Sequence, residues 1–264
     1  MTTPSVVTVC PLSGVVAPVS GQTVTTEGVV TASYPTGGLN GFYIQTPGAD
    51  TADASDAIFV YGGPTGFETY PAIGDSVRVV GVAGENSGQT QINASAGTVT
   101  SIAALGTVTP KSAIPGTTCA LPGADCETLA TLAPSREVME GELIKPTADF
   151  TVTDPYDGSA FWPGNSNSSG MFGEIGLAAG TDKPLVAPTE LYDGQNESSL
   201  VAQRTAYNNA RRVLLDDASS ANYAVTGSNT SQAFPWLTAS HSVRVGAAVT
   251  FPEPVVRELT QEMP

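Results

Sequence analysis

Short apolar runs separated by turn residues dominate the first half of the chain. Between residues 15 and 109, Val, Ile, Phe, Tyr and Thr gather in segments that are typical of β-strands. The separators are rich in Gly, Pro and Asn, which favour turns and interrupt helices. Five short strands with glycines that allow curvature predict a small closed β-barrel. The five runs cover residues 23–31, 41–46, 57–61, 76–82 and 90–92.

Strand-like patterning returns in the second half after a break. It is strongest at residues 137–145, 149–153, 212–216 and 242–246. Residues 197–211 are compatible with a helix, but this segment is short and weakly amphipathic. The pattern therefore predicts an all-β protein, in which a small barrel is followed by a second, mainly β, barrel-like domain with at most one short helix.

Four prolines and weak periodicity mark the boundary between the two halves, within residues 106–134. Cys119 and Cys126 frame a Pro-Gly turn there, a spacing that fits either a disulfide-closed loop or two buried thiols, and Cys10 is left over. We expect an N-terminal extension at 1–14, a barrel domain at 15–106, a Pro-rich linker with the disulfide loop at 107–135 and a second domain at 136–264.

Composition and charge limit the possible partners. The chain has 28 Gly, 20 Pro and 13% charged residues, and ten basic against 25 acidic residues give a net charge of -15. Such acidity disfavours loose attraction to nucleic acid or anionic lipid. No apolar run is long enough to span a bilayer. The first residues lack the basic and apolar regions of a signal peptide, so a secreted or cell-surface protein, which we expect here, would already have lost its signal.

Several strings of the first half occur together in one known kind of domain. They are Thr26-Glu-Gly-Val-Val-Thr31, Gly38-Leu-Asn-Gly-Phe-Tyr-Ile-Gln-Thr-Pro47, Ser55-Asp-Ala-Ile-Phe-Val-Tyr61, Ile73-Gly-Asp-Ser-Val-Arg-Val79 and Gly88-Gln-Thr-Gln-Ile92. In order and spacing this region resembles the oligonucleotide/oligosaccharide-binding (OB) domain that precedes the catalytic domain of bacterial extracellular nucleases. Residues 139–143, 185–190 and 208–217 resemble the region that joins that domain to the nuclease. Glu142 departs from the pattern, because it stands where an apolar residue is expected, and so does the Asn/Ser-rich insertion around Asn165.

The resemblance implies an OB-type barrel and a link to nuclease function. The catalytic part of such proteins belongs to the exonuclease/endonuclease/phosphatase superfamily, which uses Asp-x-Asn and Asp-His motifs to hold metal and activate water. This chain contains neither motif, and its one histidine, His241, follows Ser240 and lacks a neighbouring acid. The sequence therefore indicates a non-catalytic accessory region that positions nucleic acid or supports a catalytic domain absent from this chain. The alternative is a structural or adhesive surface module that self-associates or binds envelope proteins.

Candidate nucleic-acid contacts follow from strand alternation. If Phe42, Ile44, Ile58 and Val60 point into the barrel, the other face carries aromatic side chains on which bases could stack. Arg78 is the only basic residue among residues 1–110 that could contact phosphate beside them, which predicts weak binding. The alternative is that the aromatic residues pack under loops or against the second domain. The aromatic candidates are Tyr43, Phe59 and Tyr61.

Two other groups of charged residues are candidates. Arg211 and Arg212 precede an apolar strand that Asp216 and Asp217 follow, so they form either a phosphate clamp or charge pairs at the strand ends. Aspartates recur at every third position of one loop and could bind calcium or magnesium, which would also make nucleic-acid binding cation-dependent. Solvated loop carboxylates are the alternative. The three aspartates are Asp50, Asp53 and Asp56.

Overall fold

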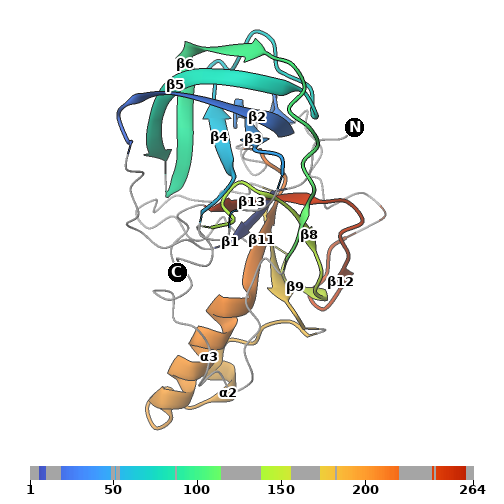
Figure 1. Cartoon of the computed structure of the whole chain (residues 1–264). Helices are drawn as coiled ribbons and strands as arrows, with labels where there is room; N and C mark the ends of the chain where they lie inside the picture. Colours follow the sequence, from blue (N-terminus) through green and yellow to red (C-terminus); the bar gives the residue numbers. More distant parts are fainter. Residues whose placement is uncertain are drawn as a thin grey trace.

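The protein is built from two β units, seen in a computed structural model of the chain (Figure 1). The structure describes residues 6–9, 19–48, 51, 54–86, 88–113, 138–155, 173–181, 183–219, 240 and 242–259. One unit is a barrel, and the other is a larger sheet that carries a helical hairpin. The described part is mostly strand, which confirms the predicted all-β class.

The first unit is a closed barrel of five strands. Around the barrel the strands follow the order β2-β3-β4-β6-β5, and β2 pairs with β5 to complete the circle. Neighbouring strands are antiparallel except for β4 and β6, which are parallel. The bounds are β2 (Thr23–Tyr34), β3 (Gly41–Gln45), β4 (Ala57–Tyr61), β5 (Ser76–Asn86) and β6 (Gln89–Ser101).

The side chains of β3 and β4 alternate as the sequence predicts. Phe42, Ile44 and Val60 are buried in the barrel core, and Ile58 packs against it. Tyr43 and Phe59 belong to a separate cluster on the outer side of the same strands. Successive side chains of a strand point to opposite faces, so this register fixes which residues face the second unit.

The second unit is an eight-stranded sheet with the order β12-β9-β10-β11-β1-β13-β8-β7. We expected a barrel-like domain, but the described strands form a sheet with β12 and β7 at its ends. Its core is apolar and comes from β8 to β13. The bounds are β1 (Val6–Val9), β7 (Lys111–Ala113), β8 (Leu143–Pro146), β9 (Phe150–Asp154), β10 (Ile175–Ala179), β11 (Arg212–Asp216), β12 (Ala248–Val249) and β13 (Val255–Leu259).

Two segments contribute strands to the sheet of the second unit although the sequence pattern placed them outside the second domain. β1, from the expected N-terminal extension, lies between β11 and β13, antiparallel to the first and parallel to the second. β7, from the expected linker, pairs with β8. Both pairings join residues far apart in the chain, so local periodicity does not reveal them. The two β units therefore do not correspond to two consecutive segments of sequence.

The expected strand at 242–246 is wrong. Gly246 has a φ of +87°, and the amide of Ala247 donates to the carbonyl of Arg244, so the segment forms a turn. The strand follows this turn as β12, which pairs with β9. A glycine at a left-handed position ends the extended run that the alternation of Val243 and Val245 suggested.

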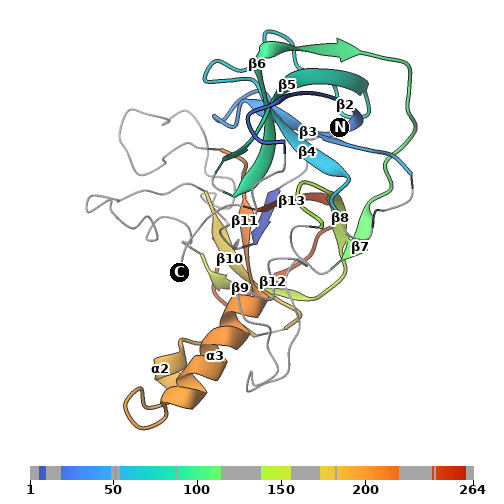
Figure 2. The same cartoon turned by 60° about the vertical axis from the view of Figure 1, so that its left-hand side comes forward.

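Two helices form a hairpin, α2 (Pro188–Leu191) and α3 (Ser198–Arg211), where we expected at most one. α3 occupies the helix-compatible segment, and α2 begins with a proline, which suits the first turn of a helix. The hairpin projects away from the barrel at the far end of the second unit (Figure 2). None of the described helices is long and apolar enough to cross a membrane.

We expect Asp193, in the turn between these helices, to titrate below the usual aspartate pKa of about 3.9. Its carboxylate accepts hydrogen bonds from the backbone amide of Gln195 and from the side chain of Asn196, and these lower the pKa of Asp193. A depressed pKa in the folded state means that the turn is stabilised above the unfolded pKa and loses this contribution as the pH falls through the folded pKa. An NMR titration of the Asp193 carboxyl carbon measures the shift, with Asp193→Asn as the control for assignment. An ordinary pKa would contradict the hydrogen bonding of this turn.

Candidate binding surfaces and the barrel–sheet interface

The expected aromatic platform lies at the interface between the barrel and the second unit. Tyr43 is completely buried, Phe59 is 3% exposed, and their ring centroids are 4.9 Å apart. Ala218, which follows β11, belongs to the same cluster, and Leu143 of β8 packs against it. Tyr61 is half-buried beside them. In this structure Tyr43 and Phe59 are therefore not available to stack on bases, and their position fits the alternative of packing against the second domain.

A short segment that leads into β8, from Glu140 to the first β8 residue Leu143, lies directly on this aromatic face, and we call it the strap. Gly141 has a φ of +72°, and a Cβ atom there would lie 3.1 Å from the ring of Tyr43. A side chain at this position would meet both an unfavourable backbone conformation and the tyrosine ring. The glycine therefore lets the backbone of the strap approach Tyr43 closely.

Hydrogen bonds between the strap and the barrel surround this aromatic contact. One Glu140 carboxylate oxygen accepts from the Thr90 amide at 2.7 Å, and one Glu142 oxygen accepts from the Asp56 amide at 3.1 Å. The Leu143 amide donates to the side-chain carbonyl of Gln45 at 2.9 Å. Polar groups that lose contact with water are costly unless they are hydrogen-bonded, so these contacts are what allows a polar segment to be buried here.

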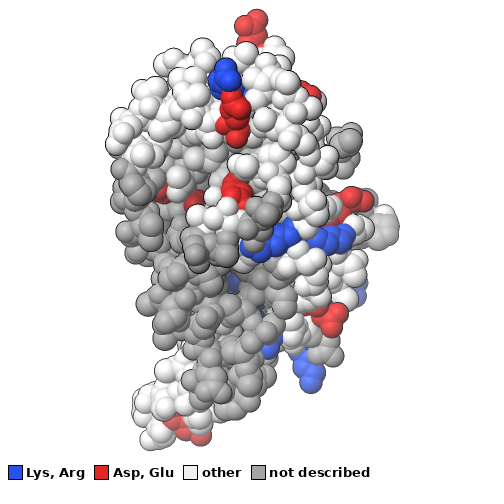
Figure 3. Space-filling model, in the orientation of Figure 1, with Lys and Arg blue, Asp and Glu red and all other residues white. Residues whose placement is uncertain are grey.

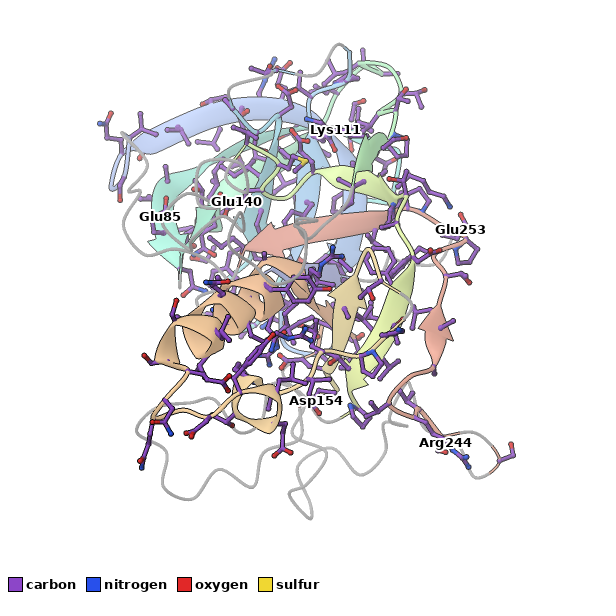
Figure 4. All side chains as sticks on the ribbon, turned by 90° about the horizontal axis from the view of Figure 1, so that it is seen from below. Glu85, Lys111, Glu140, Asp154, Arg244 and Glu253 are labelled. Atoms are coloured by element: carbon purple, nitrogen blue, oxygen red, sulfur yellow. The ribbon has the colours of Figure 1, made fainter. Side chains whose placement is uncertain are left out.

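The surroundings of Glu142 explain why an acid stands where the sequence pattern expects an apolar residue. Its side chain is completely buried, and the carboxylate binds the amide of Asp56 just before β4 begins. Glu140 is also buried, and Figure 4 shows it on the same side of the molecule as Glu85 of β5. Thr90 links these two carboxylates, because its hydroxyl donates to Glu85 and its amide donates to Glu140. An acid at an expected apolar position was the sequence signal of this interface, but its partners could not be read from the sequence.

A second connection joins the units beside the aromatic cluster. Gly38 forms an isolated antiparallel bridge with Ser219, and the Ser219 hydroxyl donates to the carbonyl of Gly37 at 3.3 Å. Within the barrel, the Tyr43 hydroxyl accepts a hydrogen bond from the side chain of Gln89, which orients the ring that the strap covers. The barrel is thus attached to the second unit along β3 and β4, at the start of β6 and at the turn between β2 and β3.

Arg78 lies elsewhere on the barrel and is paired. Its guanidinium contacts a Glu27 carboxylate oxygen at 2.6 and 2.7 Å, across the β2–β5 register. Both side chains are exposed, so the pair is worth about 0–1 kcal/mol. Charged side chains are sparse on the face of the molecule shown in Figure 3. Arg78 and the aromatic residues therefore do not form one binding groove.

The metal prediction remains a prediction. Asp56 accepts hydrogen bonds from the amide and the hydroxyl of Thr51, at 2.8 and 2.6 Å. Asp50 and Asp53 lie outside the described residues, as do the expected disulfide partners Cys119 and Cys126, the third cysteine Cys10, and His241. Among the residues that are described, no group of three or more His, Cys, Asp or Glu side chains could hold a metal ion.

Arg211 and Arg212 lie where α3 passes into β11, at the end of the second unit away from the barrel. One terminal nitrogen of Arg211 donates to the carbonyls of Ala179 and Gly180, at 2.9 and 2.7 Å. This holds the end of α3 against the end of β10. Arg212 is half-buried at the start of β11.

The two aspartates of the expected charge pairs form hydrogen bonds with the backbone just after β11. The carboxylate of Asp216 accepts from the amide of Ala218, and the carboxylate of Asp217 accepts from the amide of Ser219. They therefore stabilise the turn that carries Ala218 and Ser219 to the barrel.

Arg204 and Tyr207, both on α3, were not predicted as site residues. The guanidiniums of Arg204 and Arg211 each lie 4.7 Å from the centroid of the Tyr207 ring. All three side chains are buried. Their spacing of three and four residues was a usable signal, since such positions share one face of a helix.

No protein-family model, curated protein or solved structure matches this chain significantly.

Proposed function

We propose that this chain is a non-catalytic accessory region of a secreted bacterial nuclease, and that it supports a catalytic domain rather than stacking nucleic-acid bases on its barrel. The observation that carries the proposal is the burial of Tyr43 and Phe59 beneath the strap. The barrel face that would bind a strand serves instead as an internal interface.

The strand order supports an OB-type assignment of the barrel. In chain order the five barrel strands are neighbours as 1-2-3-5-4, the third and fifth are parallel, and the first and fourth close the circle. OB barrels bind ligands on the face formed by their second and third strands, which here are β3 and β4. These are the strands whose outer side chains pack against the second unit.

The charge of the chain also argues against nucleic-acid binding by the barrel. Binding of a nucleic-acid strand draws much of its affinity from contacts between basic residues and phosphates. Arg78 is paired with Glu27, and the net charge of the chain is -15. Support of a neighbouring domain therefore fits this barrel better than an electrostatic groove for nucleic acid.

The alternative, a self-associating surface module, receives less support from the strands. The barrel is closed and offers no free edge. In the described part of the sheet, the end strands β12 and β7 have only two and three residues. Short edge strands are a common protection against edge-to-edge pairing. Assembly through other surfaces would appear as a stable oligomer in light scattering.

Fluorescence anisotropy with labelled single- and double-stranded DNA at low salt tests the proposal. We expect weak binding or none, with calcium or magnesium and with chelator. We further expect Tyr61→Ala, which shortens the half-buried aromatic side chain of β4, to leave the result unchanged. Arg78→Gln, which removes the candidate phosphate contact of the barrel, should also leave the result unchanged. DNA binding that Tyr61→Ala weakens tenfold would show that the barrel face does bind strands.

The supporting role needs its own measurement. Fusing this chain ahead of an exonuclease/endonuclease/phosphatase catalytic domain from an extracellular nuclease should raise the thermal midpoint of that domain relative to the domain alone. An unchanged midpoint and unchanged turnover would contradict support. Metal-dependent nuclease turnover by the unfused chain would contradict the non-catalytic assignment.

A further inference from the structure

The structure assigns a phosphate-binding role to Arg204, at the face of α3 that also carries Tyr207 and Asn208. Arg204 is 8% exposed, and its guanidinium stacks on the Tyr207 ring. Among the described residues it has no hydrogen bond or ion pair, and its Nε atom is buried without a partner. Arginines are rarely buried to this degree unless they are paired. No described residue supplies this partner, and we assign that role to an anion from solution.

The local sequence provides no compensating acid. α3 contains no Asp or Glu and two arginines, in a chain with only ten basic residues. The acids nearest in sequence lie in the preceding turn, where Asp193 binds Gln195 and Asn196, and Glu197 accepts from the Asp193 amide. The guanidinium of Arg211 also lies on the Tyr207 ring, and its hydrogen bonds to the carbonyls of Ala179 and Gly180 hold it there. The Tyr207 ring on which Arg204 stacks is thus also held by Arg211.

The side chain of Asn208 limits which anions fit this site. Its side-chain nitrogen donates to the carbonyl of Val186 at 2.9 Å, which fixes the orientation of the amide. Its Oδ1 atom is buried and has no partner among the described residues. Asn208 lies one helical turn after Arg204, so an unpaired donor and an unpaired acceptor occur on the same face of α3.

Inorganic phosphate, which keeps a proton at neutral pH, satisfies both atoms, and so does a phosphate monoester in its monoanionic form. Its charged oxygens accept from a guanidinium, whose planar fork suits phosphate, and its protonated oxygen donates to an amide carbonyl. An ionised carboxylate, a sulfate and a phosphodiester carry no such proton. Both unpaired atoms are closed off from solvent here, so binding requires the Arg204 side chain, which keeps a small exposed part, to turn toward the ligand and the Asn208 oxygen to become accessible as well. This inference does not depend on the proposed function.

Titration of the intact chain with inorganic phosphate tests the site, with sulfate and chloride at the same ionic strength as comparisons. We expect saturable binding by calorimetry, a shift of the Arg204 Nε–H resonance in NMR spectra, and binding of sulfate about tenfold weaker. A comparison of a 5′-phosphorylated oligonucleotide with its 5′-hydroxyl counterpart distinguishes a phosphate at the end of a nucleic acid from free inorganic phosphate. Binding of the phosphorylated strand identifies a nucleic-acid end as a ligand, and binding of inorganic phosphate alone identifies a small-anion site.

Variants give the second arm of the test. Arg204→Gln should weaken phosphate binding about tenfold or more, which corresponds to the loss of one charge-assisted contact. Arg78→Gln removes the same charge from the barrel and should have no effect. Arg204→Lys keeps the charge without the planar fork and should bind with intermediate affinity, which is informative even if Arg204→Gln loosens α3. Phosphate that binds no better than chloride, or that leaves the Arg204 resonance unmoved in the unaltered chain, would overturn the inference.

Discussion

Tyr43→Ala is expected to lower the free energy of unfolding by about 3–5 kcal/mol, the range found when a large buried aromatic side chain is truncated. Tyr43 is completely buried between Tyr34, Phe59 and the strap, so its removal leaves a cavity at the interface of the two units. Urea denaturation followed by circular dichroism measures the change. Because the cavity lies at the interface, hydrogen exchange should quicken at the amides of Asp56, Thr90 and Leu143, which join the barrel to the strap.

Tyr43→Phe is the matched control. It keeps the ring and removes only the hydroxyl that accepts from Gln89, so it should cost about 1 kcal/mol. If Tyr43→Ala is no more destabilising than Tyr43→Phe, the aromatic face does not hold the two units together. In that case the scaffold role proposed for the chain would lose its structural basis.

Gly97→Ala is expected to destabilise the barrel by about 3 kcal/mol or more, the upper end of the cost of overpacking. The register of β5 and β6 shifts between Val80 and Val82, and β6 bulges there. A Cβ atom on Gly97 would lie 1.9 Å from the carbonyl oxygen of Val80. This obstacle is backbone, so relief requires the bulge itself to change, and the bend that lets these long strands close the barrel depends on it. Thermal and urea denaturation give the magnitude.

Gly84→Ala provides the comparison, since Gly84 lies on β5 of the same strand pair. A Cβ atom there would meet nothing within 4 Å. Alanine restricts the unfolded chain more than glycine does, so this variant should be neutral or more stable by about 0.5–1 kcal/mol. Equal destabilisation by both substitutions would mean that the contact at Gly97 is not what limits the barrel.

The second unit shows where pattern reading fails. β11 was predicted with its observed bounds, because Val213, Leu214 and Leu215 form an apolar run between charged residues. β1 was read as part of an extension, because four residues carry too little periodicity to identify a strand. Its place between β11 and β13 depends on pairing across the length of the chain. The sheet order is thus a property of long-range register rather than of local sequence.

The sequence by itself determined the all-β class, the five barrel strands and the side of β3 and β4 on which Tyr43 and Phe59 lie. These follow from the two-residue period of strands and from turn-forming glycines, which act locally. Only the tertiary structure decided what covers those aromatic residues, that Glu142 is buried on the amide of Asp56, and that Arg204 stacks on Tyr207 without an acid. Burial and pairing depend on which distant segments meet, and the pattern along one strand or helix carries no record of its neighbours.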